Sequence, residues 1–146
     1  MTKPTTQGEI RIPKTLGAEK EARERVRLLG GSMGFSKERI EDIMTAVGEA
    51  CLNAIEHGSS DDPTDTVLVR FDPGPGALEV LVSSKGAPFA FSYVEPDIRM
   101  KIEGNDRPRG WGLFLIRRLA DGVEISSEGD VTTVKMKFLL QPKQRP

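Results

Sequence analysis

The chain has 146 residues, with 21 Lys and Arg against 22 Asp and Glu, and a formal net charge of −1. This balance gives no global attraction to nucleic acid or to a membrane surface, and 37% hydrophobic content is typical of a soluble globular protein. The single cysteine excludes an internal disulfide, and no apolar run approaches the length of a membrane-spanning helix. The first residues also lack the apolar stretch of a signal peptide, so a cytoplasmic location is expected.

The N-terminal region predicts a tail, a strand and a helix. Residues 1–8 are polar and are expected to form a flexible tail ahead of a single domain over residues 9–141. Isoleucines alternating with charged side chains predict a half-buried strand over residues 9–14. Apolar residues at helical spacing predict a helix over residues 18–29, which Gly30 and the glycine after it should end.

The longest amphipathic pattern in the chain covers residues 36–58. Apolar residues recur there at i, i+3, i+4 and i+7, as on the buried face of a helix that begins at the N-cap Ser36 and ends at Gly58. Glu49 and Asn53 are one turn apart and fall roughly opposite that apolar face. A carboxylate and an amide so placed can bind two parts of one ligand, although any surface helix also has a polar side.

Strands and one irregular segment follow this helix. The patterns predict strands over residues 66–71 and 78–82, joined as an antiparallel hairpin by a turn over residues 72–76. Residues 85–109 carry several Gly and Pro residues and are the least regular part of the chain, with a weak helical signal over residues 94–102. A loop of this length is uncommon in a compact domain unless it is functional or disordered.

The C-terminal region predicts a helix and a second hairpin. Apolar residues at helical spacing cover residues 110–121, and strands are predicted over residues 123–126 and 131–139, around a turn at Gly129. Two hairpins need antiparallel neighbours, and the helices need one face of a sheet to cover them. The element order therefore predicts an α/β fold, a two-layer sandwich in which a mixed, mostly antiparallel sheet carries about three helices on one face.

A glycine motif stands at the start of the helix over residues 110–121. Gly110 and Gly112 leave backbone N–H groups open, and the positive end of the helix dipole favours an anion. Arg109 adds positive charge beside them. Glycines before a helix are also common as simple turn residues, so this motif alone permits either interpretation.

The stretch EACLNAIEHG at residues 49–58 resembles the N-box of the gyrase and histidine-kinase ATPase superfamily. It looks closest to the bacterial anti-sigma-factor serine/threonine kinases. The resemblance covers nearly the whole chain, because its length, element order and second glycine motif also fit. It implies the histidine-kinase-like ATPase fold, binding of ATP and Mg²⁺, and phosphorylation of a protein.

The resemblance also implies a role for each matching residue. Glu49 would be the general base, and Asn53 would hold Mg²⁺ through its carbonyl oxygen. Residues 88–108 would cover the bound nucleotide as a lid. The remaining residues implied to shape the nucleotide pocket are Ser84, Gly86, Arg109, Gly110 and Gly112.

The first glycine box departs from the family pattern Asp-x-Gly-x-Gly. Ser84 stands where the family has the Asp that binds the adenine amino group, and Pro88 replaces the second glycine. Residues 72–76 match the pattern literally, but they precede the strand that the box should follow. Loss of the carboxylate weakens adenine binding by about 1–3 kcal/mol, because a charged acceptor forms a stronger hydrogen bond.

The implied substrate is a small anti-sigma-factor antagonist protein, and the implied second partner is a sigma factor held by a homodimer, with no direct contact to nucleic acid or membrane. The alternative is a regulatory binding module of the same fold with weakened or lost nucleotide binding. Ser84 and Pro88 favour that alternative, whereas the intact Glu49 and Asn53 favour the kinase.

Overall fold

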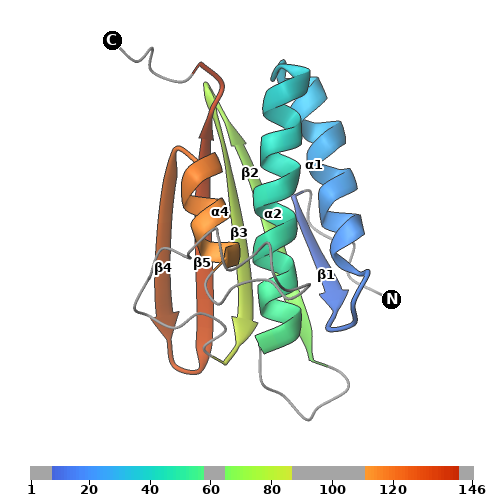
Figure 1. Ribbon diagram of the computed structural model, residues 1–146, viewed down its shortest axis with the longest axis vertical. Helices are drawn as coiled ribbons and strands as arrows, with labels where there is room; N and C mark the ends of the chain where they lie inside the picture. The colour runs from blue at the N-terminus through green and yellow to red at the C-terminus, as the bar shows by residue number, and fades with distance from the viewer. Residues whose placement is uncertain (1–7, 58–64, 87–110, 142–146) are drawn as a thin grey trace, which may run out of the picture.

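The computed structural model describes residues 8–57, 65–86 and 111–141. The strands are β1 (Glu9–Pro13), β2 (Thr66–Gly74), β3 (Ala77–Lys85), β4 (Gly122–Glu128) and β5 (Val131–Leu139), and the helices are α1 (Glu19–Met33), α2 (Lys37–His57) and α4 (Trp111–Leu119). One sheet has the strand order β1-β2-β3-β5-β4, and the helices cover one of its faces (Figure 1). The predicted two-layer α/β sandwich is confirmed, and all four pairings between the described strands are antiparallel.

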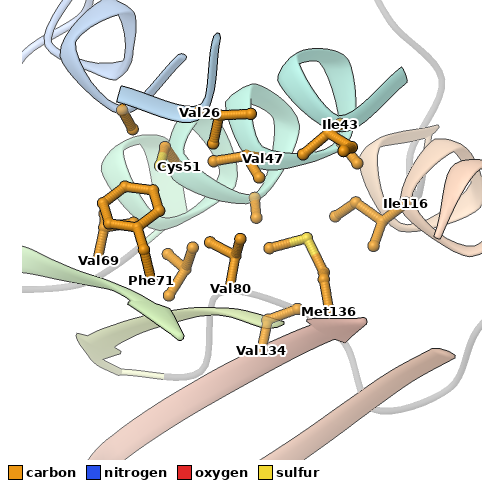
Figure 2. Packing of buried hydrophobic residues seen from close by; sticks show 14 of the residues in the cluster. Val26, Ile43, Val47, Cys51, Val69, Phe71, Val80, Ile116, Val134 and Met136 are labelled. Carbon is orange, nitrogen blue, oxygen red and sulfur yellow. The ribbon is translucent and has the colours of Figure 1, made fainter. Parts of the chain in front are cut away.

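Strict alternation in the sheet separates a core face from an outer face. Along β5, for example, Val134, Met136 and Phe138 point inward and are buried, while the lysines between them point outward. Helix α2 lies over the centre of this inward face, between α1 and α4 (Figure 1). Figure 2 shows the resulting core, in which the helices contribute Val26, Ile43, Val47, Cys51 and Ile116 and the strands contribute Val69, Phe71, Val80, Val134 and Met136.

Helix α1 continues past the two glycines at which the sequence predicted its end. It reaches Met33, and Gly34 then takes a left-handed φ of 92° while the Phe35 N–H donates to the Gly30 carbonyl at 3.1 Å. Gly30 stays helical because it lies against α2, where a Cβ atom would come within 3.1 Å of the Ile40 side chain. Close packing between the helices, and not a turn, is therefore the reason for this glycine.

Helix α2 begins where the sequence predicted. The Ser36 hydroxyl accepts a hydrogen bond from the Arg39 backbone N–H at 3.1 Å, which satisfies one of the free donors at the helix start. The helix extends to His57, while Gly58, its predicted stop, lies outside the described residues. No helix in the described ranges is long and apolar enough to cross a membrane.

The β2–β3 hairpin is confirmed, but its turn is shorter than predicted. Pro73 pairs with Leu78, so the strands continue until only Pro75 and Gly76 lie between them, with Gly76 at a φ of 83°. The predicted turn over residues 72–76 includes Pro73, because proline and glycine favour turns. Strand β1 ends its pairing at Arg70, so β2 is an edge strand at this point and tolerates proline.

The fold leaves Cys51 chemically inert. Burial, with a smaller contribution from the nearby Glu19 carboxylate, raises the pKa of its thiol to about 12. We expect the folded protein at pH 8 to resist Ellman's reagent, because only the thiolate reacts and this thiol stays protonated. Prompt release of one thionitrobenzoate per chain without denaturant, measured by absorbance, would contradict this expectation.

Candidate functional site

The predicted site residues come from elements that meet at one end of the molecule. Strand β3 and helix α2 both end at the lower side of Figure 1, where β5 begins. Glu49 and Asn53 lie in the C-terminal half of α2, and Ser84 and Gly86 lie at the end of β3. A cavity of about 500 Å³ lies elsewhere, beside α1 and β2 with Phe71 in its lining, and contains none of these residues.

Glu49 and Asn53 are both half-buried on α2. The side-chain nitrogen Nδ2 of Asn53 is buried and has no hydrogen-bond partner among the residues that the structure describes. A buried amide group without a partner costs about 1–3 kcal/mol, so such groups are rare and call for a reason. An amide that binds a ligand would supply that reason.

Helix α4 packs beside α2 and runs antiparallel to it (Figure 1). Its last residue, Leu119, contacts Arg39 in the first turn of α2. Eight residue steps back along α4 cover about 12 Å, so its first turn lies at about the level of Val47, beside the half of α2 that carries Glu49 and Asn53. This turn contains no acidic residue that would oppose an anion at the positive end of the helix.

Hydrogen bonds hold the end of β3 against the β4–β5 turn. Ser84 is 4% exposed and pairs with Thr132 of β5. The Thr132 hydroxyl donates to the Gly86 carbonyl at 2.6 Å, and the Gly86 N–H donates to the Asp130 carbonyl at 2.7 Å. Gly86 has a φ of 99°, a conformation that favours glycine. Two buried residues with hydroxyl groups, Ser84 and Thr132, therefore stand opposite each other where the family pattern has its aspartate.

Sequence reasoning missed Thr132. It stands on the inward face of β5, in an alternation that is otherwise apolar at Val134, Met136 and Phe138. A threonine within a row of apolar core residues is the feature of the sequence that could have indicated a functional role. Its proximity to the candidate site is visible only from the strand register, which pairs it with Ser84, about 50 residues earlier in the chain.

The structure does not describe all of the predicted site residues. Arg109, Gly110 and Pro88, together with the weak helix over residues 94–102, lie outside the described residues. Gly112 is half-buried as the second residue of α4. No group of three or more His, Cys, Asp and Glu side chains suited to a metal occurs in the described ranges. A magnesium ion does not need one, because it often uses one or two protein oxygens together with substrate phosphates.

Residues 12–138 match the family described as the histidine kinase-like ATPase domain. The chain therefore belongs to this class of ATPases.

Curated relatives of similar sequence show to which group of these ATPases the chain belongs. The chain is 34% identical over 139 residues to the serine-protein kinase RsbW of Bacillus velezensis, with 90% of this chain and 84% of that protein covered. It is 32% identical over 111 residues to RsbW of Bacillus subtilis, with 73% and 69% covered. Within the ATPase class, the chain belongs to the anti-sigma-factor serine/threonine kinases, as its N-box indicated.

Solved structures share the fold. A structure of the RsbU and RsbW domains of Rv1364c from Mycobacterium tuberculosis has a TM-score of 0.66 at 22% identity and covers 90% of this chain. This chain spans 31% of that longer chain. The SiaB–SiaC complex from Pseudomonas aeruginosa gives a TM-score of 0.55 at 12% identity, with 90% of this chain and 88% of that chain covered.

Proposed function

We propose that the chain transfers the γ-phosphate of ATP to a serine or threonine of a small anti-sigma-factor antagonist and thereby controls the release of a sigma factor. The observation that supports the proposal is that the first turn of α4 lies beside the half of α2 that carries Glu49 and Asn53, in a chain 34% identical to a serine-protein kinase. The buried side-chain nitrogen of Asn53, which has no partner within the described ranges, supports a ligand there.

The adenine ring would lie at the end of β3. Ser84 offers a hydroxyl group that can donate or accept a hydrogen bond, the Thr132 oxygen can only accept one because its proton is donated to the Gly86 carbonyl, and Gly86 lets the backbone approach the ring closely. The phosphates would lie at the first turn of α4, where Gly112 keeps the backbone N–H groups accessible. Arg109 and Gly110, which directly precede α4, complete this proposed phosphate site.

The residues present fit a magnesium ion. Asn53 would bind it through its side-chain oxygen, the hard ligand type that Mg²⁺ prefers. When bound with ATP, the ion would supply positive charge against the phosphate oxygens.

Glu49 would act on the substrate hydroxyl. Its carboxylate would take the proton of the substrate serine as the hydroxyl oxygen bonds to the γ-phosphorus. The bond from the γ-phosphorus to the bridging oxygen would break, and ADP would leave with the electron pair. A carboxylate one helical turn from the metal ligand Asn53 is well placed for this step.

We also propose that the protein holds its sigma factor as a homodimer in the cytoplasm, as the family resemblance implies. The rival possibility is a binding module of the same fold without catalysis, which Ser84 in place of an aspartate would favour. Calorimetric titration with Mg-ATP and Mg-ADP separates the two. We expect the protein to bind both nucleotides and to transfer label from γ-³²P-ATP to an antagonist. If it binds neither nucleotide, the non-catalytic binding module is the correct interpretation.

The substitution Ser84→Asp tests where the base binds. A carboxylate at this position should accept a hydrogen bond from the adenine amino group and tighten ADP binding by about 1–3 kcal/mol. GDP should not gain, because guanine presents a carbonyl there that a carboxylate repels. The ratio of ADP to GDP affinity, measured by calorimetry in both proteins, is the readout. An unchanged ratio would show that the base does not lie beside residue 84.

A further inference from the structure

One side chain links the start of α2 to the end of α4. The guanidinium of Arg39 donates through Nη1 to the Leu119 carbonyl at 2.6 Å and through Nη2 to the Asp121 carboxylate at 2.5 Å. Leu119 is the last residue of α4, and carbonyl groups at a helix end lack partners within the helix. The positive charge of Arg39 therefore caps the negative end of α4.

The sheet holds this link in place from the other side. The Asp121 carboxylate also accepts the Leu139 N–H at 2.7 Å, and the Asp121 N–H donates to the Lys137 carbonyl at 2.8 Å. The Arg39 guanidinium lies 5.6 Å from the centre of the Phe138 ring, and the Arg39 side chain is only 17% exposed. Partial burial and several bonds per group make this pair stronger than an exposed ion pair.

Helix α4 is short enough for its two ends to move together. It has nine residues and is about 12 Å long, and no proline interrupts it. Fixing Leu119 against α2 therefore also fixes the axial position of the first turn of α4. That turn lies beside the half of α2 that carries Glu49 and Asn53.

We propose that Arg39 is a positioning residue for ATP, which holds α4 where its first turn can bind the phosphates. Arg39 reaches the end of α4 opposite to the phosphate site, so it acts through the helix and not by contact with the nucleotide. The proposal rests on the proposed function, since it needs the phosphates at the first turn of α4. The binding of the adenine base at Ser84 should not depend on Arg39.

The substitution Arg39→Met tests this proposal. Methionine keeps an apolar stem over Phe138 but removes the bonds to Leu119 and Asp121. We expect the affinity for ADP to fall about tenfold, while the affinity for adenosine changes less than about twofold. Adenosine lacks the phosphates, so the ratio of ADP to adenosine affinity isolates the contribution of α4. Calorimetric titration measures the affinity for ADP directly, and the affinity for adenosine is measured by its competition with ADP.

Lys14→Met is a matched control. Lys14 and Asp65 form an ion pair at 2.7 Å with side chains only 12% and 7% exposed, between the end of β1 and the start of β2. Its loss should lower the melting temperature without changing the ADP-to-adenosine ratio. Arg39→Lys should recover part of the ratio, because one ammonium group cannot reproduce the forked contacts of a guanidinium.

Three outcomes would overturn the proposal. An unchanged ADP affinity in Arg39→Met, or equal losses of ADP and adenosine affinity as in a merely loosened fold, would overturn it while the proposed function stands. A wild-type protein that binds neither compound would overturn the proposed function and this inference with it. Asp121→Asn, which weakens the same link from the other partner, provides the same comparison if Arg39→Met does not fold.

Discussion

Replacing Glu49 with alanine should lower the rate of phosphotransfer by about 10²–10⁴-fold and change nucleotide affinity only a few-fold. A general base acts on the nucleophile in the transition state, and its loss costs rate in about that range. It makes little contribution to the binding of ATP in the ground state, so affinity should persist. Transfer of label from γ-³²P-ATP to the antagonist and calorimetric titration with Mg-ADP give the two numbers.

Two further variants sharpen this test. Glu49→Gln keeps the size and hydrogen bonding of the side chain but removes its basicity, so it should lose nearly as much rate as the alanine variant. Glu41, an exposed carboxylate on the same helix, serves as the matched control, and Glu41→Gln should transfer phosphate at the wild-type rate. Equal losses of rate and of ADP affinity in Glu49→Ala would reassign this residue to ligand positioning.

The parts of the fold that could be predicted from the sequence are those determined by interactions between residues close together in the chain. Ser36 caps α2 because a serine oxygen can reach a backbone N–H three residues later, whatever the rest of the chain does. The strands of both hairpins were recognisable from alternation and from the turns between them. The positions of Glu49 and Asn53 one turn apart on α2 were predictable because a helical period fixes that relation.

The parts that the sequence did not predict depend on contacts between distant residues. Gly30 looked like a stop signal, and only the packing of Ile40 against it shows that the helix uses it for close approach. Thr132 became a site residue through its register with Ser84, and Arg39 bonds to Asp121 across 82 residues. No local pattern reports such pairs, because each partner taken alone is an ordinary strand or helix residue.

Asn53→Leu should change stability and nucleotide binding in opposite directions. Asn53 Nδ2 is buried without a hydrogen-bond partner in the described part of the chain, and an apolar side chain of similar size removes the cost of this unsatisfied donor. We expect the nucleotide-free protein to become more stable by about 1–3 kcal/mol in its free energy of unfolding, measured by urea denaturation. A residue kept only for the fold would not carry this cost, whereas a ligand-binding residue can.

The same substitution should remove the magnesium dependence of nucleotide binding. In the wild-type protein, Mg-ADP should bind at least about tenfold more tightly than ADP with EDTA, and in Asn53→Leu the two affinities should be equal, because leucine offers no oxygen ligand. Asn53→Asp keeps an oxygen at this position and should keep the dependence, but it should destabilise the nucleotide-free protein by placing a charge in a partly buried position. Lower stability of Asn53→Leu together with an intact magnesium dependence would mean that the amide supports the fold and that the metal binds elsewhere.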